Sequence, residues 1–229
     1  MRHSPGRAPG GPAGIGGGGG APGPFAPFED EANTVFAAFP TSATAQEQRW
    51  INTCIRAFKD ASVWAKFDLL YAPFAVSVEG NALINWITPG SYTLTAVNSP
   101  TYTAYRGLAG NGSSSYYASG WDAATNGIAI SQNSAHLGAY VMNDTASTGQ
   151  EGAGASATLR VRGRSGSNGF TSVNGTTGVV GVGAVTPPFH QMGIRRVSTT
   201  VLLFHDGVQD ATAASTSAAT SRSLRSAGS

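Results

Sequence analysis

The chain has 229 residues, a length that suits one β domain of sandwich or barrel size. Charged residues make up only 11% of it, against about a quarter in ordinary globular proteins, while 31 residues are glycine. This exchange of charge for turn-forming residues favours a β-rich protein with many turns and argues against a helical bundle.

The charge balance gives little sign of a nucleic-acid partner. Lysine and arginine number 14 against 12 acids, for a net charge of +2, whereas nucleic-acid binding needs a basic stripe. The densest basic run is "RVRGR", residues 160–164. Because Arg160 and Arg162 would share one face of a strand, we interpret the run as a solvated sheet face, with a phosphate track as the alternative.

The cysteine content and the hydrophobicity of the chain limit which covalent and metal links it can form and where it is made. Cys54 is the only cysteine, which excludes an internal disulfide and a multi-cysteine zinc site. The start "MRHSPGRAPGG" has no apolar signal core, and no stretch approaches 18 apolar residues. We therefore expect synthesis in the cytoplasm without a signal peptide, and no membrane span.

Glycine, proline and alanine dominate the first 30 residues and bury too little apolar surface to offset the entropy of ordering. They predict a flexible arm, and a disordered start or a misplaced start codon is the alternative to a docking role. Phe28 and Phe36 then flank an acidic cluster, residues 29–31. This segment is expected to pack on a neighbour or on the following helix.

The clearest helical signal is "TAQEQRWINTCIRAFKD". Thr44 and Glu47 have the spacing of a capping box, and apolar residues then recur at helical intervals. Cys54 lies in that apolar stripe, which favours a buried structural thiol over a nucleophile. Asp60 is expected to cap a second amphipathic helix over residues 61–74, "ASVWAKFDLLYAPF".

Beyond residue 81 the apolar period changes from helical to alternating. Short runs are separated by Gly, Asn, Ser or Pro at the intervals of an antiparallel sandwich, with no helix-length segments between them. The runs are "SYTLTAVN", "TYTAYRG", "GIAIS", "HLGAYVMN", "ATLRVRG", "TGVVGV", "HQMGIRRVS" and "TVLLFHDG". Residues 143–156 and 163–169 are expected to be long, mobile loops.

One hairpin is predicted in detail. "TYTAYRG" would form a strand, the Asn-Gly pair in "LAGNGSS" the turn, and "SYYASGW" the returning strand. The aromatic residues of this stretch, among them Tyr102, Tyr116 and Trp121, are interpreted as core or cross-strand packing in preference to a ligand platform.

Residues 31–210 contain "INTCIRAFKDASVWAKFDLLYAPFA", "NALINWITPGSYTLTAVNSPTYTAYRGLAGNGSSSYYASGWD" and "SQNSAHLGAYV". Together these segments resemble a recurrent structural protein of tailed bacteriophages, prophages and gene-transfer-agent particles. The most specific elements are the "VWAK" segment with "DLLY", the "NW" pair, "RGLAGNGSSSYYASGW" and "NSAHLG". None of them is a catalytic signature.

The resemblance implies a mainly β fold, an antiparallel jelly-roll sandwich of the concanavalin A-like, LamG-like type. The domains would be a Gly/Pro-rich arm over residues 1–30, a helical pair for packing or anchoring over 31–80, and the sandwich over 81–229. The chain departs from the family at Pro73, which breaks a helix. It departs again after residue 221, where the family has further strands, so a neighbouring subunit would complete the sandwich or this copy is truncated.

Catalytic and metal-binding patterns are weak. Glycoside hydrolysis needs two carboxylates about 5 to 9 Å apart in a cleft, and the best pair, Asp206 and Asp210, first indicates a hairpin of the Asp-Gly type. Calcium would need several oxygen ligands, which acids and loop carbonyls could supply, but no ligand run is present. His136 is interpreted as a strand residue, residues 178–185 as a Gly-broken strand, and no cofactor is expected.

Binding through loops is the remaining mode. "GWDAATNG" carries Trp121, Asp122 and Asn126, and "GRSGSNG" carries Arg164 and Asn168. Loops gather at the ends of a sandwich, where these side chains would offer a sugar an aromatic face, amide donors and a carboxylate. They are our candidate carbohydrate-binding residues, and ordinary solvated turns are the alternative.

The expected function is a non-enzymatic virion structural protein, such as a head or tail fibre, spike or decoration protein, with a host-glycan-binding sandwich. Its partners would be other virion proteins, further copies of itself and host surface polysaccharide, but not nucleic acid. Many copies on one particle would turn weak sugar contacts into avidity. A purely structural decoration or cement protein is one alternative, and a polysaccharide depolymerase is another.

Overall fold

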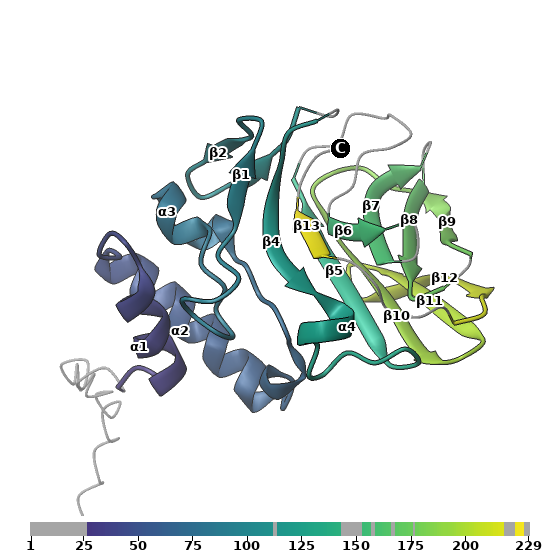
Figure 1. Cartoon of the computed structure of the whole chain (residues 1–229), viewed down its shortest axis with the longest axis horizontal. Coiled ribbons are helices and arrows are strands. Elements are labelled where there is room, and N and C mark those ends of the chain that lie inside the picture. Colours follow the sequence, from purple (N-terminus) through teal and green to yellow (C-terminus); the bar gives the residue numbers. More distant parts are fainter. Residues whose placement is uncertain are drawn as a thin grey trace, which may run out of the picture.

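The computed structural model places the helices of residues 30–82 on one side of a long strand, Tyr116–Asp122, and the strands of residues 135–226 on the other side (Figure 1). The residues that the structure describes are 27–111, 114–142, 153–156, 159–165, 168–175, 177–217 and 223–226. Residues 1–26 of the expected arm and 143–152 of the first expected loop lie outside this set. The loop expectation is wrong for residues 153–156, 163–165 and 168–169, which lie in strands.

Most of the helices precede the strands in the chain. The helical elements are α1 (Asp30–Ala38), α2 (Ala45–Asp60), the 3-10 turns η1 (Trp64–Lys66) and η2 (Pro73–Ala75), α3 (Glu79–Ala82) and α4 (Ala123–Asn126). The strands are β1 (Thr95–Val97), β2 (Thr101–Thr103), β3 (Gly107–Ala109), β4 (Tyr116–Asp122), β5 (Ala135–Val141), β6 (Ala153–Ser156), β7 (Leu159–Ser165), β8 (Asn168–Val173), β9 (Val179–Ala184), β10 (Phe189–Val197), β11 (Thr200–His205), β12 (Val208–Ala214) and β13 (Ser223–Ser226). The protein is mainly β, as its composition predicts.

Two antiparallel sheets make up the β domain. In the described part of the chain the first sheet has the order β1-β4-β13-β6-β7-β8-β9, and the second has the order β12-β11-β10-β5. Strands β8 and β9 of the first sheet contact β10, β11 and β12 of the second. The buried core between the sheets comprises Trp121, Ala123, Ala135, Leu159, Val173, Val179, Val201 and Leu203.

Ring contacts lie within the α1 segment, and ion pairs join that segment to α2. The rings of Phe28 and Phe36 lie edge to face, with centroids 5.5 Å apart. Lys59 Nζ on α2 lies 2.8 Å from a Glu29 carboxylate oxygen and 2.7 Å from one of Glu31. The expectation that this aromatic and acidic segment packs on the following helix is confirmed.

Helix α2 begins with the predicted capping box. The Thr44 hydroxyl accepts a hydrogen bond from the Glu47 N–H, and the Glu47 carboxylate accepts one from the Thr44 N–H. The buried Glu47 carboxylate also accepts a hydrogen bond from the Ser77 N–H at 2.6 Å. Burial raises the pKa of Glu47, but these hydrogen bonds outweigh burial, so the pKa lies below its usual value.

The helix expected over residues 61–74 is wrong. Ser62 adopts a left-handed conformation with φ of 56°, and beyond it only the short turns η1 and η2 are helical before α3. Leu69 packs with the core of the β domain, whereas Leu70 packs with the core of the helices. Successive residues therefore pack into different cores, as in an extended segment, where side chains alternate between two faces.

The predicted hairpin between residues 101–107 and 115–121 is also wrong. The chain reverses earlier, at Tyr105 with φ of 58° and Gly107 with φ of 141°, so β2 pairs with β3. Strand β4 instead pairs with β1 on one side and with β13 on the other. The chain turns at residues 104–106, ahead of the Asn-Gly pair at residues 111–112, and Gly112 lies outside the described residues.

We call residues 27–90 and the β2–β3 hairpin the N-terminal unit. Its buried core comprises Ala32, Val35, Phe39, Ile51, Ile55, Ala72, Ala75, Val76, Ala82, Ile84 and Trp86, with Tyr102 packed against it. The Asp68 carboxylate accepts backbone hydrogen bonds from residues 128–130 at 2.6, 2.9 and 2.8 Å. The Tyr117 hydroxyl on β4 donates to Glu79 at 2.7 Å. These bonds fix the N-terminal unit against the β domain.

The chain supplies a further strand beyond residue 214. Strand β13 lies between β4 and β6, and Arg225 is paired with Ala118 on one side and Gly154 on the other. It joins two parts of the first sheet that have no other strand between them. The chain's own residues, and not those of a neighbouring subunit, therefore connect β4 to β6.

Gly193 on β10 lets the two sheets approach closely. A Cβ atom there would lie 2.0 Å from Thr171 Oγ1 and 2.7 Å from Val173 Cγ2 on β8. Gly193→Ala is therefore expected to lower the free energy of unfolding by about 1–3 kcal/mol, measured by urea denaturation.

Gly138→Ala is the control for this prediction. Gly138 lies beside β10 on the solvent side of the second sheet, and its Cβ would meet no atom closer than 3.5 Å. The free energy of unfolding should change by less than about 0.5 kcal/mol. Equal losses in the two variants would contradict the close approach at Gly193.

Candidate binding surface

Three of the five candidate carbohydrate-binding residues form a local cap at the end of β4. Trp121 is only 2% exposed and belongs to the core between the sheets. Asp122 accepts hydrogen bonds from the N–H groups of Ala124 and Thr125, at 2.9 and 3.1 Å, and so caps α4. Asn126 accepts one from the Asp122 N–H. The buried indole therefore has no face on which a sugar could stack.

The other two candidates lie on strands of the same sheet, well away from β4. Asn168 begins β8, and its side-chain amide donates to the Gly181 carbonyl on β9 at 2.6 Å. Arg164 lies within β7, and its side chain is outside the described part of the structure. Because β13, β6 and β7 separate β4 from β8, the five residues do not converge on one place.

Asp206 and Asp210 lie at the predicted Asp-Gly hairpin. Asp206 and Gly207 connect β11 to β12 with φ of 46° and 80°. The two acids line a shallow pocket of about 340 Å³ with His205. His205 Nδ1 is 3.1 Å from Asp210 Oδ2, and its Nε2 is 3.1 Å from Gln191 Oε1. Both ring nitrogens are thus engaged, and His205 links β10 to β12.

The buried Arg195 is also used to hold the fold. It is 1% exposed, and burial lowers its pKa. Its guanidinium donates to the carbonyl oxygens of Val173 (2.6 Å), Ser215 (2.9 Å), Ser198 (3.1 Å) and Val197 (3.2 Å), and to the Ser215 hydroxyl (3.2 Å). These oxygens belong to the end of β8, the β10–β11 turn and the segment after β12. The Arg195 side chain therefore links three separate segments of the chain by hydrogen bonds.

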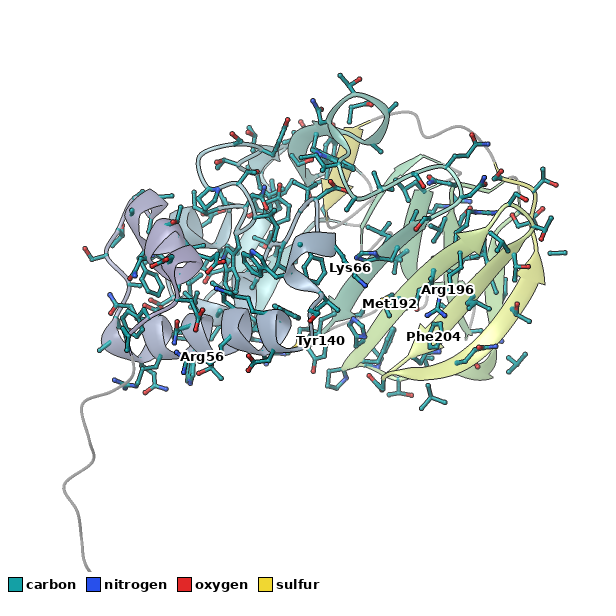
Figure 2. All side chains as sticks on the ribbon, turned by 90° about the horizontal axis from the view of Figure 1, so that it is seen from below. Arg56, Lys66, Tyr140, Met192, Arg196 and Phe204 are labelled. Carbon is teal, nitrogen blue, oxygen red and sulfur yellow. The ribbon has the colours of Figure 1, made fainter. Side chains whose placement is uncertain are left out.

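The second sheet has one apolar surface that faces solvent. Figure 2 shows Met192 and Phe204 side by side on this surface, with Tyr140 nearer the N-terminal unit. Along β10 and β11 the residues alternate between the buried core and this side. We define the outer face by the following residues: Tyr140, Met192, Ile194, Leu202 and Phe204. Tyr140 is 52% exposed and the other four are half-buried.

Cationic side chains border the outer face. Arg196 follows the buried Arg195 on β10 and is exposed, four residues along the same strand from Met192 (Figure 2). Lys66 lies at the β5 edge, because its neighbour Phe67 packs edge-on against His136 of β5. Burial lowers the pKa of His136, which favours the neutral ring. The outer face therefore combines aromatic and apolar side chains with two permanent positive charges.

Sequence reasoning identified β5, β10 and β11 as strands, but it missed β12 and the outer face. The signal that could have found it is "VLLF", residues 201–204. In a strand covered on one side only, apolar and polar residues alternate, whereas a continuous apolar run is typical of a strand covered on both sides. Val201 and Leu203 are buried in the core, so Leu202 and Phe204 mark a second surface that can be covered.

Other chemistry is sparse in the described residues. They contain no group of three or more His, Cys, Asp or Glu side chains that could hold a metal ion. None of the described helices is long and apolar enough to cross a membrane. Cys54 packs against the core of the N-terminal unit, and burial raises the pKa of its thiol, as expected of a structural cysteine.

Comparisons with known proteins do not add a relative. No family model, curated protein or solved structure matched this chain. The residues and their arrangement therefore carry the functional proposal.

Proposed function

We propose that this chain is a non-enzymatic structural protein of a tailed phage or phage-like particle, and that its outer face packs against another protein of the particle. The observation that carries the proposal is the apolar run of β11. Its Leu202 and Phe204 lie on a sheet surface that no part of the described chain covers. The resemblance of residues 31–210 to particle proteins supplies the setting.

The composition of the outer face suits a protein interface. Aromatic residues, methionine and arginine are enriched where proteins meet, and lysine is depleted at interface centres. Met192 and Phe204 are paired on neighbouring strands of the face, and Arg196 lies further along β10, beyond Ile194. The partner we propose has an apolar centre bordered by carboxylates, which would pair with Arg196 and Lys66.

The fixed junction between the two parts of the chain also supports a structural role. Asp68 and Glu79 hold the N-terminal unit against the β domain through side-chain hydrogen bonds. A particle component that is mounted through one part and exposes another needs such a rigid connection. We interpret the two facing antiparallel sheets as a concanavalin A-like jelly roll, which is the fold that the resemblance implies.

The proposal predicts that Met192→Glu strongly reduces incorporation into particles, because a buried carboxylate would face an apolar partner. Particles purified from the strain that carries the gene would be labelled with gold-conjugated antibody raised to residues 80–229. Wild-type label should lie on the head or tail surface, and the variant should lose at least about nine-tenths of it, corresponding to roughly 1.4 kcal/mol of binding.

Val182→Glu serves as the control, because Val182 is exposed on β9 of the other sheet. It should be incorporated like the wild type, and both variants should keep the wild-type melting temperature. Assembled particles without label would overturn the proposal, and so would normal incorporation of Met192→Glu. If deletion weakens particles without changing adsorption to cells, the protein is a decoration or cement protein.

A polysaccharide depolymerase is the second candidate, favoured by the pocket that Asp206 and Asp210 share. It predicts new reducing ends when the purified chain is incubated with host polysaccharide, and loss of this activity in Asp206→Asn. That result would contradict a non-enzymatic role.

A further inference from the structure

Two aromatic side chains of the N-terminal unit face each other and are open to solvent. Trp50 on α2 is 46% exposed, and Tyr105 in the β2–β3 turn is 45% exposed. Their ring centroids are 6.0 Å apart and their planes are inclined at 86°. In this arrangement the edge of one ring meets one face of the other, so the pair itself leaves the remaining ring faces unused. We call the pair the aromatic corner.

Backbone structure holds the aromatic corner in place. Trp50 lies inside the longest helix of the described chain. The Tyr105 N–H donates to the Val76 carbonyl, and the Arg106 N–H closes the turn on the Thr103 carbonyl, both at 3.0 Å. Tyr105 has a left-handed φ of 58°, which is uncommon for a large side chain. Such strain persists only where the surroundings enforce it, and it is concentrated at functional sites.

Polar and cationic groups surround the aromatic corner. Gln46 lies one helical turn before Trp50 on the same helix face. Arg49 donates to the Gln46 side-chain oxygen at 2.8 Å, and Arg106 is adjacent to Tyr105. Gln46, Arg49 and Arg106 are all exposed. Within the described residues, neither arginine forms an ion pair with a carboxylate.

We propose that the aromatic corner binds an acidic polysaccharide built from uronic acid sugars. The apolar face of one sugar ring would stack on an open aromatic face, and its hydroxyls would bond to the Gln46 amide. The sugar carboxylate would accept hydrogen bonds from Arg49 or Arg106. Two rings offer far less than the roughly 800 Å² that each partner contributes to a stable protein interface. A sugar therefore fits the aromatic corner better than a protein surface does.

This site differs from the loops that the sequence predicts for glycan binding, and it does not depend on the proposed role in a particle. The test is affinity electrophoresis of the purified full-length chain in native gels containing alginate, polygalacturonate or hyaluronate, with dextran as the uncharged polymer. The wild type is expected to be retarded by at least one uronate polymer and not by dextran. Trp50→Ala should weaken this binding at least tenfold, and Trp50→Phe should restore part of it.

Arginine variants separate a specific site from general attraction between a basic protein and an acidic polymer. Arg106→Gln should weaken binding and reduce its dependence on salt, whereas Arg196→Gln, which removes an exposed charge from the second sheet, should not. Tyr140→Ala is the control for loss of an exposed aromatic ring. Equal effects of Arg106→Gln and Arg196→Gln would overturn the proposal, as would retardation that is unchanged in Trp50→Ala.

Two further outcomes count against the aromatic corner as a sugar site. If none of the three uronate polymers retards the wild type, acidic polysaccharide binding is wrong. If Trp50→Ala instead loses incorporation into particles while polymer binding is absent, the corner is a protein contact. Neither result bears on the outer face, because incorporation of Met192→Glu is measured separately.

Discussion

Replacing Arg195 with methionine is expected to lower the free energy of unfolding by about 3–4 kcal/mol, because several buried acceptors lose their donor together. The carbonyl oxygens of Val173, Ser198 and Ser215 are among those that the guanidinium now satisfies. For a chain of this size the melting temperature should fall by about 10 °C. Thermal and urea denaturation followed by circular dichroism would measure the change.

Arg196→Met is the matched control for this experiment. It makes the same substitution at the next position of β10, where the side chain is exposed on the other side of the sheet. Its effect on the free energy of unfolding should stay below about 0.5 kcal/mol. If the two variants were equally stable, the five hydrogen bonds of Arg195 would have no net role in holding the connections together.

Glu47→Gln is expected to lower the free energy of unfolding by about 2–3 kcal/mol at neutral pH, because it leaves a buried donor without an acceptor. The two carboxylate oxygens accept from different N–H groups, those of Thr44 and Ser77. An amide has one oxygen only, so its NH₂ group would point at a backbone N–H. Asp60→Asn, at the exposed end of the same helix, should change the free energy by less than about 0.5 kcal/mol.

The contribution of Glu47 to the free energy of unfolding should also depend on pH, and the direction of its pKa shift fixes the direction of that dependence. Its pKa in the folded chain lies below the ordinary value of 4.5, so the folded state favours the carboxylate. The stabilisation is present in full above the unfolded-state pKa and is lost as pH falls through the folded-state pKa. The difference between the wild type and Glu47→Gln should therefore shrink in acid below about pH 4.5. A difference that stays constant through that range would contradict this assignment.

Local patterns predicted the elements that depend on local chemistry. The capping box of Thr44 and Glu47 starts α2 as expected, and the Asp-Gly pair at residues 206–207 joins β11 to β12. The helix predicted over residues 61–74 does not form, because contacts with residues far away in the sequence determine the conformation of that segment. Its Asp68 binds the backbone of residues 128–130, and no pattern within the segment reveals them.

The candidate sites show the same limit. Trp121 was a reasonable sugar-stacking candidate as an aromatic residue next to a polar loop, but its exposure depends on which side of β4 faces the core. Trp50 falls at helical spacing among the apolar residues of α2, yet it meets Tyr105 in solvent. The packing of distant segments determines the solvent exposure of both tryptophans, and a single sequence does not reveal that packing.

The position of β13 determines when the first sheet can be completed. Ala118 and Arg225 are paired although almost half of the chain separates them. On the ribosome, β4 and β6 therefore present open edges until residues 223–226 have been made, so this sheet closes late and its rate is limited by long-range pairing. During that interval the exposed edges can pair with other nascent chains. A cell that makes many copies at once would need chaperones to protect them.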